Sequence, residues 1–358
     1  MAKITLQNLR QSYYPNPAKD EDYALKRVHL DWEDGGAYAL LGPSGCGKTT
    51  LLNLISGLLI PTEGEILFDG TDVSRLSTEK RNIAQVFQFP VIYDTMTVYD
   101  NLAFPLRNRN VPEADVDARV REIAGMLDLT RTLGNRASNL TADGKQKISL
   151  GRGLVRSDVN VIMFDEPLTV IDPHLKWQLR SKLKELHQRI RRTMIYVTHD
   201  QTEALTFADQ VVVMNDGQVV QSGTPIELFE KPRHTFVGHF IGSPGMNVLP
   251  CEVRDGQAFF AGHPIATGNA GLYQAAAGTL ELGVRPEFVS FSETGIPVTV
   301  TKVSDAGRFR IVETRAADHA IKLIAPEGSD VPGGRAHLAF DRGHTQVYAG
   351  GWMVGAGP

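Results

Sequence analysis

Over its first two thirds the chain alternates mainly apolar runs with amphipathic segments. Four of these runs read as strands buried on both faces of a sheet, namely 38–41, 159–164, 193–198 and 210–214. Helical periodicity fills the segments between them, namely 49–58, 173–191 and 201–208. This order of strand, helix and strand predicts an α/β layer structure with a parallel sheet.

Two departures from this rhythm predict further features. The segment 65–73 alternates as a hairpin would, with Asp69-Gly70 at its turn. Between about Phe89 and Asp158 the helical period dominates, as in 98–106 and 116–127, so a helical subdomain is expected to interrupt the α/β body.

The pattern changes again after Gly242-Ser243-Pro244-Gly245. Short apolar runs at 278–284, 296–300 and 336–340 stand between Gly, Pro and Asp turns, which is typical of a small all-β, barrel-like domain. A length of 358 residues also favours two domains over one. We therefore expect a nucleotide-binding domain at 1–236, with the helical subdomain at about 89–158, and a β-barrel domain at 237–358.

Composition narrows the class of protein. A formal charge of −4 and a charged content of 22% lack the basic excess of a nucleic-acid binder. No apolar stretch is long enough to cross a bilayer, and the start of the chain lacks the core of a secretory signal. Two cysteines, Cys46 and Cys251, favour a reducing compartment, and the histidines show no metal-ligand spacing with them.

The run from Gly42 to Thr49 is a complete G-x-x-x-x-G-K-[ST] phosphate loop, and it lies between an expected strand and an expected helix. Its members are Gly42, Pro43, Ser44, Gly45, Cys46, Gly47, Lys48 and Thr49, followed by Thr50. Backbone amides and Lys48 would bind the phosphates of ATP or GTP, and the Thr49 hydroxyl would bind Mg²⁺. A thiol at a helix N-terminus has a lowered pKa, so alkylation of Cys46 should block nucleotide binding.

Two adjacent carboxylates end the strand at 159–164. We expect Asp165 to hold Mg²⁺, directly or through water, and Glu166 to polarise or deprotonate the water that attacks the γ-phosphate. His199, after the strand at 193–198, would donate a hydrogen bond to the γ-phosphate. The alternative for an isolated Asp-Glu pair is a helix cap, and a lone histidine at a strand end is most often structural.

Taken together, these residues resemble the ATP-binding cassette subunits of ABC importers, in the carbohydrate and polyol branch that carries a C-terminal regulatory β domain of OB-like barrel type. The family's motifs recur in order, as the phosphate loop, Val86-Phe87-Gln88, Phe164-Asp165-Glu166-Pro167-Leu168, Asp172, Thr198-His199-Asp200 and Arg285-Pro286-Glu287. The resemblance implies that Gln88 contacts Mg²⁺ and the water, that Asp172 crosses a dimer interface, and that Tyr13, or else Tyr14, stacks on adenine.

The resemblance also implies partners and a location. They are a second ATPase subunit, transmembrane permease subunits and, indirectly, a solute-binding protein, at the cytoplasmic face of the inner membrane. The region of Phe89 and Tyr93 would form the groove for a permease helix, with core packing as the alternative. The transported solute would be a sugar, glycerol or another polyol.

The chain departs from this family at the signature Leu-Ser-Gly-Gly-Gln, which contacts the partner's nucleotide. Here the stretch reads Leu140, Thr141, Ala142, Asp143 and Gly144. A carboxylate 4 Å from a phosphate oxygen costs about 4 kcal/mol at an effective dielectric of ~20. We therefore expect an asymmetric pair with a different ATPase whose signature is intact.

Three alternatives stay open. One is a homodimer whose signature loop shifts to accommodate Asp143. Another is a nucleotide switch without a transport role, in which the β domain binds a ligand or signalling protein. The third is a soluble phosphate-loop kinase, against which Glu166, His199 and the recognisable signature helix favour water as the phosphoryl acceptor.

Overall fold

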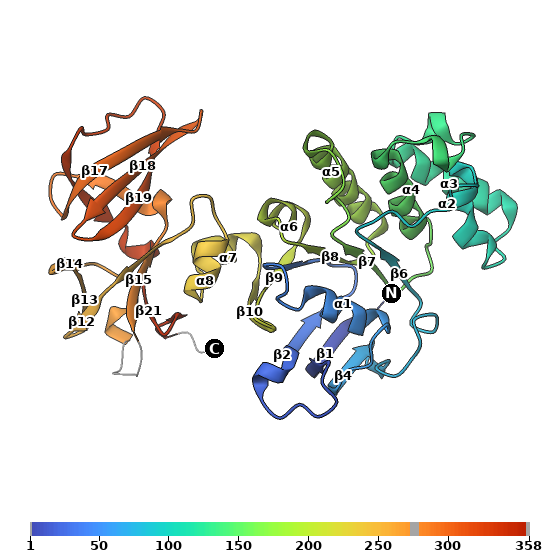
Figure 1. The fold of residues 1–358 in the computed structure, drawn as a ribbon, viewed down its shortest axis with the longest axis horizontal. Coiled ribbons are helices and arrows are strands. Elements are labelled where there is room, and N and C mark those ends of the chain that lie inside the picture. The colour runs from blue at the N-terminus through green and yellow to red at the C-terminus, as the bar shows by residue number, and fades with distance from the viewer. Residues whose placement is uncertain (1, 273–278, 356–358) are drawn as a thin grey trace. The chain divides into compact units, whose positions relative to one another are not determined.

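A computed structural model describes residues 2–272 and 279–355 of the chain (Figure 1). The chain divides into two compact units, Met1–Pro225 and Ile226–Pro358. The sequence placed the boundary later, after residue 236, because composition changes only near Gly242. Helices α7 (Pro225–Glu230) and α8 (Thr235–Phe240) are instead tied to the second unit.

Arg285 explains that assignment. Its guanidinium is buried and donates to the backbone carbonyls of Leu228, Phe229, Gly238 and Ile241, at the ends of α7 and α8. Burial lowers the pKa of Arg285 to about 10. The arginine of the Arg-Pro-Glu motif therefore fixes both helices to the β domain.

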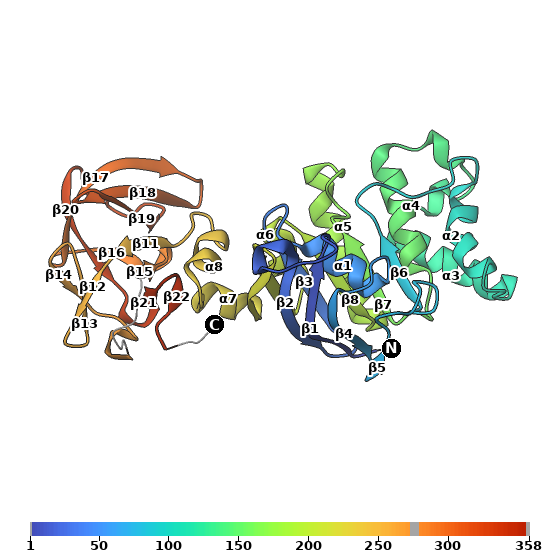
Figure 2. The same cartoon turned by 60° about the horizontal axis from the view of Figure 1, so that its bottom comes forward.

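Two sheets build the first unit (Figure 2). An antiparallel sheet has the order β2-β1-β4-β5, from β1 (Ile4–Ser12), β2 (Tyr23–Trp32), β4 (Glu63–Phe68) and β5 (Thr71–Asp72). The predicted hairpin is confirmed, since β4 pairs with β5 and both Asp69 and Gly70 have positive φ, at 49° and 77°.

The second sheet has the order β10-β9-β3-β8-β7-β6, and its neighbours from β9 to β6 are parallel. Its strands are β3 (Ala37–Leu41), β6 (Ile83–Val86), β7 (Val161–Asp165), β8 (Thr193–Thr198), β9 (Gln210–Asn215) and β10 (Gln218–Gly223). Helix α1 (Lys48–Ser56) lies between the two sheets, where its apolar side chains join one core with both (Figures 1 and 2).

The other helices of the first unit match the expected segments closely. They are α2 (Val98–Arg107), α3 (Glu113–Met126), α4 (Ala142–Leu154), α5 (Pro173–Ile190) and α6 (Gln201–Phe207). One predicted boundary is wrong: the first helix was expected over 49–58, yet Leu58 lies beyond its end and is 54% exposed. The helix ends at Ser56 because Gly57 adopts the left-handed conformation, with φ 81°, and caps it.

Beyond α8 the second unit is almost entirely β structure. One sheet joins β11 (Asn247–Pro250), β15 (Leu280–Val284), β21 (Thr345–Ala349) and β22 (Trp352–Met353). Another joins β12 (Glu252–Arg254), β13 (Gln257–Phe260) and β14 (His263–Ile265). The largest joins β16 (Val289–Ser292), β17 (Ile296–Asp305), β18 (Phe309–Ala316), β19 (His319–Pro326) and β20 (Arg335–Phe340).

The three predicted β runs correspond to β15, β17 and β20, and Gly278 of the first run lies outside the described residues. A single apolar core fills the space between the sheets. Short 3-10 helices punctuate the described chain at Asp20–Asp22, Thr130–Thr132, Ala137–Asn139, Ala270–Leu272, Pro286–Phe288 and Arg342–His344.

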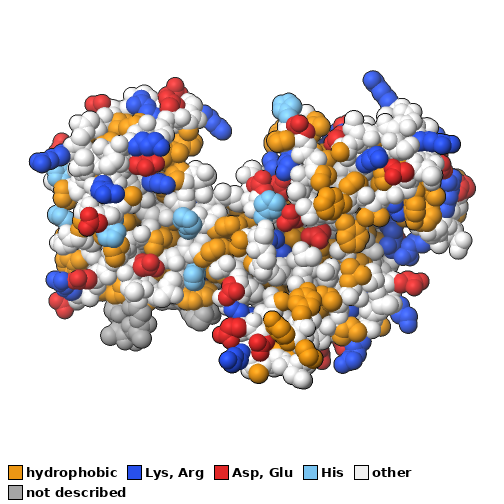
Figure 3. Space-filling view, in the orientation of Figure 1, with side chains coloured by type: hydrophobic (Ala, Val, Ile, Leu, Met, Phe, Trp, Pro, Cys, Tyr) orange, Lys and Arg blue, Asp and Glu red, His pale blue; other side chains and the backbone are white. Residues whose placement is uncertain are grey.

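Surface chemistry agrees with the modest net charge. Figure 3 shows Lys and Arg side chains mixed with Asp and Glu over the face in view. Within residues 2–272 and 279–355, none of the helices combines the length and hydropathy that crossing a membrane would demand.

Candidate nucleotide-binding and hydrolysis site

The phosphate loop joins the carboxyl end of β3 to α1, as the sequence predicts. Gly47 forms the N-cap of α1 with a φ of 101°. Residues other than glycine rarely adopt this backbone conformation. Gly42 is buried, and a Cβ there would collide with the carbonyl of Met214 and the sulfur of Cys46. Both glycines are therefore required by the backbone path of the loop.

Lys48 places its ammonium inside this loop. The side chain is only 5% exposed, and Nζ donates to the carbonyl oxygens of Gly42 at 2.7 Å and Pro43 at 2.9 Å. The free amides at the start of α1 lie beside it. Positive charge and N–H donors thus converge at one helix end, which is the arrangement that binds phosphate.

The expectation for Cys46 is wrong in its sign. The thiol is 3% exposed, and this burial raises its pKa even though Lys48 Nζ, 3.9 Å from Sγ, works in the opposite direction. Removal from water disfavours a thiolate more than the nearby charge favours it. Cys46 therefore packs inside the loop, where burial favours its thiol form over the thiolate.

A hollow of about 370 Å³ opens at the loop. Its walls come from the phosphate loop, the residue after Asp165 and the antiparallel sheet, and are formed by Tyr13, Ala24, Ser44, Gly45, Gly47, Lys48, Thr49, Thr50 and Glu166. Tyr13 contacts the first turn of α1 through Oη, 3.1 Å from Thr50 Oγ1, and the residue is 62% exposed. Tyr14 is not part of this wall.

The remaining predicted residues follow the carboxyl ends of parallel strands. Gln88 comes after β6, Asp165 ends β7, and His199 comes after β8. The pairings Val86 with Phe164 and Asp165 with Val197 place these ends at the same edge as Gly42. Gln88 is half-buried there, outside the wall of the hollow.

The two acidic residues at this edge differ in environment. Burial, together with the neighbouring Glu166 charge, raises the pKa of Asp165, and Lys48 opposes the shift. Glu166 leaves the strand direction with a φ of 46°, while its N–H donates to the carbonyl of Val197 at 3.0 Å. The backbone turn therefore takes the Glu166 side chain into the hollow and leaves Asp165 at the strand end.

Glu166 and His199 form the contact that a hydrolytic site needs. His199 Nδ1 lies 3.1 Å from Glu166 Oε2, and Thr169 donates to the same oxygen at 3.3 Å. The imidazole is exposed and the carboxylate half-buried. A base oriented by a histidine beside a phosphate cradle can accept a proton from water.

The altered signature begins α4. Thr141 is the N-cap, and its side chain accepts from the Gly144 N–H at 3.3 Å, so the helix start is intact. Ala142 is exposed and Asp143 half-buried. A Cβ at Gly144 would approach the Leu140 Cβ to 3.1 Å, so this position is close against the preceding turn.

Asp143 is not an isolated charge. Its Oδ2 lies 3.2 Å from Lys147 Nζ, one turn along α4, while Oδ1 is buried and has no hydrogen-bond partner among the described residues. Sequence reasoning missed Lys147, although the spacing of four residues was a usable signal. Asp172, the expected interface residue, is exposed and caps α5 by accepting from the His174 N–H at 2.8 Å.

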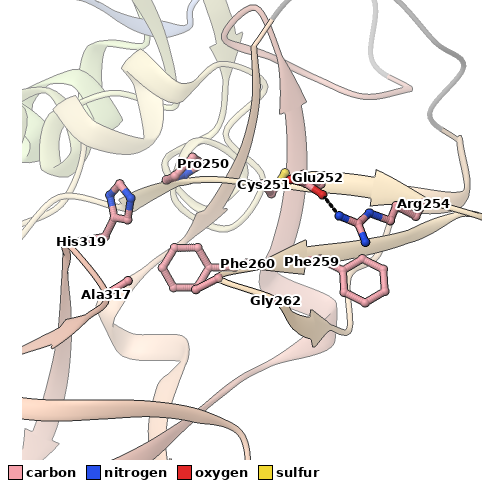
Figure 4. A pocket seen from close by; sticks show the side chains of 10 residues that line it. Pro250, Cys251, Glu252, Arg254, Phe259, Phe260, Gly262, Ala317 and His319 are labelled. Carbon is pink, nitrogen blue, oxygen red and sulfur yellow. Dashed lines mark hydrogen bonds and ion pairs between the residues drawn. The ribbon is translucent and has the colours of Figure 1, made fainter.

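A larger hollow, of about 510 Å³, lies in the second unit (Figure 4). Figure 4 shows Arg254 directed at Glu252, its ion-pair partner, and Arg254 also lies 5.7 Å from the ring centre of Phe259. The Glu252 carboxylate offsets the guanidinium charge. Because phosphates need uncompensated donors and positive charge, the smaller hollow at the phosphate loop is the better nucleotide site.

Comparison with known proteins agrees with this geometry. The chain matches the family described as ABC transporter over residues 25–169 and the MalK OB fold domain over residues 242–289. It is 38% identical to the sn-glycerol-3-phosphate import ATP-binding protein UgpC of Bordetella avium, over 90% of this chain and 88% of that protein. It is also 38% identical to the uncharacterized ABC transporter ATP-binding protein y4oS of Sinorhizobium fredii, over 97% and 93% of the two chains.

A solved structure gives the same answer. The chain resembles cbiO1 from Clostridium perfringens, part of the ABC transporter complex cbiONQ, with a TM-score of 0.58 and 27% identity. The likeness covers 64% of this chain and 90% of that one. The chain therefore belongs to the ATP-binding subunits of ABC transporters, ATPases that couple ATP hydrolysis to transport, in the branch that carries a C-terminal OB-fold domain.

Proposed function

We propose that this chain is the ATPase subunit of an importer for a small polar solute, and that it forms one half of an asymmetric ATPase pair. A polyol or its phosphate is the favoured solute, since several relatives are named for the import of sn-glycerol-3-phosphate. One contrast supports the asymmetry. The phosphate loop and the strand-end residues Asp165, Glu166 and His199 are intact, whereas the signature stretch holds Asp143.

ATP would bind in the hollow at the phosphate loop. Lys48 and the amides at the start of α1 bind the β- and γ-phosphates, and Tyr13 stacks on adenine. The contact of Tyr13 with Thr50 supports this, because it holds the ring at the edge of the loop. Hydrophobic and stacking contacts to the base then add to the phosphate interactions.

The residues at the strand ends fit Mg²⁺. Mg²⁺ in nucleotide sites takes few protein ligands and otherwise binds water and phosphate oxygens. Thr49, in the wall of the hollow, and Asp165, at the end of β7, supply a hydroxyl and a carboxylate of that kind, and Gln88 supplies an amide on the next strand. When bound, the ion would neutralise phosphate charge, and the carboxylate of Asp165 would be more readily ionised beside it.

Hydrolysis would depend on Glu166 and His199. The Glu166 carboxylate accepts a proton from water positioned at the γ-phosphate, and His199 orients the carboxylate through their 3.1 Å contact. The lysine ammonium stays close to the phosphates throughout and stabilises developing negative charge. Asp172 would lie at the interface with the second ATPase.

The signature stretch would face the nucleotide of the other subunit. Asp143 would repel its γ-phosphate, and the pairing with Lys147 reduces that repulsion without restoring the lost backbone contacts. Damage at Asp143 therefore affects the partner's nucleotide, whereas this chain's own nucleotide would meet an intact signature. The site built on this chain's Glu166 would be the active one.

A surface on the first unit fits a permease helix. Phe87, Phe89, Val91 and Tyr93 follow β6 and are all exposed, at 40%, 69%, 53% and 40%. Tyr93 packs on Phe104 of α2 with ring centres 4.8 Å apart, and Arg152 lies 4.7 Å from its ring centre. An apolar surface that is not covered by its own chain suits an amphipathic helix, which would hold this chain at the cytoplasmic face of the membrane.

The test is to identify every subunit that co-purifies with the tagged full-length chain from solubilised membranes, by intact mass and peptide sequencing. A second, different ATPase together with membrane subunits is the expected result. Recovery of this chain with itself alone would contradict the asymmetric pair and favour the homodimer. Absence of membrane subunits would favour a nucleotide switch without a transport role.

A further inference from the structure

Glu203 of α6 lies against the His199 segment and has no part in the chemistry described above. Its side chain is buried, with the residue 4% exposed. Oε2 accepts from Thr198 Oγ1 at 2.8 Å and from Tyr196 Oη at 3.2 Å, and Oε1 lies 3.7 Å from Lys176 Nζ. A buried carboxylate requires such partners, so this one holds three side chains together.

The Thr198 hydroxyl connects Glu203 to the backbone around His199. It donates its hydrogen to Glu203 and accepts the Asp200 N–H at 3.0 Å. Asp200 in turn caps α6, since its Oδ1 accepts from Thr202 N–H at 2.7 Å. The residues immediately before and after His199 are therefore both fixed through one hydroxyl whose orientation Glu203 sets.

Two further contacts, with Tyr196 and Lys176, hold the Glu203 carboxylate in place. Burial, together with the nearby Glu203 carboxyl group, raises the pKa of Tyr196, so its phenol stays protonated and donates. Lys176 belongs to α5, which packs beside α6. Glu203 thus joins β8, α5 and the turn that presents His199.

We propose that Glu203 is a positioning residue for ATP hydrolysis, which holds His199 at hydrogen-bond distance from Glu166 by fixing the Thr198 hydroxyl. The contact between His199 and Glu166 spans 3.1 Å, and a shift of about 1 Å in one partner is enough to lower the rate strongly. The proposal rests on ATP hydrolysis by this chain and not on the asymmetric pairing.

The first experiment measures ATPase kinetics of the complex purified through the tagged full-length chain. Glu203→Met, which keeps the volume and removes both acceptors, should lower kcat by about tenfold or more and leave KM for ATP nearly unchanged. Glu203→Gln retains an acceptor and should keep most of the activity. Glu185→Gln, an exposed glutamate of α5, is the matched control and should behave as wild type.

A second pair of variants covers the case in which Glu203→Met fails to fold. Thr198→Val replaces the hydroxyl with a methyl group and should reproduce the loss of kcat. Thr198→Ser keeps the hydroxyl and should retain a kcat close to that of the wild type. Unchanged kcat in both Glu203→Met and Thr198→Val would overturn the proposal. Parallel losses of kcat, ATP affinity and melting temperature would also overturn it, because they indicate a general structural role.

A spectroscopic test uses the full-length chain alone and does not depend on any partner. In wild-type background, Glu166→Gln should shift the His199 ring nitrogen resonances, because the two side chains are in contact. In the Thr198→Val background that shift should disappear. Its persistence would show that His199 keeps its place without the hydroxyl, and would refute the positioning role.

Discussion

The two parts of the first unit to which we assign nucleotide chemistry are built differently. The hydrolytic edge, formed by Lys48, Asp165, Glu166 and His199, follows the ends of buried parallel strands. The signature stretch, Thr141 to Gly144, starts a helix. At the edge the ends of parallel strands bring the four residues together, whereas α4 keeps its cap and its start although four of the five signature positions differ from Leu-Ser-Gly-Gly-Gln. A helix start can therefore stay folded while its sequence departs from the family signature.

The largest expected effect comes from the edge. Glu166→Gln should reduce turnover of the purified pair by about 100-fold or more, since general-base catalysis contributes roughly that factor. The equivalent substitution in the second ATPase should be tolerated, because in the proposed pair the nucleotide of that ATPase faces Asp143. The measurement is steady-state ATPase activity of both variants. Equal losses of ATPase activity from the two substitutions would contradict the asymmetric pair.

A smaller effect is expected at the signature stretch. Lys147→Met should release Asp143 from its ion pair and raise, by a few-fold, the ATP concentration needed for dimer closure, because one partly screened charge is worth about 1 kcal/mol. Light scattering in a Glu166→Gln background gives that concentration. Asp143→Gly should suppress the effect, and Lys145→Met, whose partner is Asp94, is the control. If Lys147→Met still raises the required ATP concentration in an Asp143→Gly background, the ion pair of Lys147 with Asp143 does not control dimer closure.

The next expected effect concerns Tyr13 and Tyr14, whose roles a measurement of ATP affinity can distinguish. Tyr13→Ala should weaken ATP binding by about 2- to 12-fold, which corresponds to the ~0.5–1.5 kcal/mol of an aromatic stacking contact. Tyr14→Ala should change it little, and Tyr13→Phe should retain most of it because the ring and not the hydroxyl stacks. Calorimetric titration of the full-length chain compares the three. A larger loss for Tyr14→Ala would exchange their roles.

The smallest effect concerns Cys46. An acid whose pKa is raised on folding loses its proton only at higher pH, so at pH 8 the buried thiol reacts slowly with iodoacetamide and the rate rises with pH. A Cys251→Ser background isolates the signal, and ATP should slow the reaction further. Fast alkylation at pH 7 would restore the lowered pKa expected from a helix N-terminus.

Strand and helix patterns predicted the first unit well because its elements follow simple periods. The phosphate loop, Asp165 and His199 were found from motifs whose place at strand ends follows from parallel pairing. The end of the first helix was misplaced although its stop signal is local, because Gly57 caps the helix in a left-handed conformation. The unit boundary differs from the expected one because the buried Arg285 acts through tertiary contacts that no local pattern reveals. Glu203 escaped notice for the same reason: it belongs to α6, and its partners come from α5 and β8.

The net effect of burial and nearby charges on individual side chains was the feature hardest to predict from the sequence. The sequence places Cys46 at a helix N-terminus, which suggests an acidic thiol, but only the folded loop shows that burial outweighs this effect and the charge of Lys48. Asp143 is the opposite case, where the sequence shows an isolated penalty and the helix supplies Lys147 as a partner. Motifs indicate which groups are present, and packing decides their charge state.

The positive φ of Glu166 has an evolutionary consequence. A non-glycine residue in that conformation costs on the order of 1 kcal/mol, a cost that glycine would not bear. A Glu166→Gly chain should therefore be inactive yet no less stable than its parent through this backbone term. A subunit of this fold that is released from selection for hydrolysis would lose its base without a penalty in backbone strain, so inactive descendants of such ATPases can arise and persist as folded proteins.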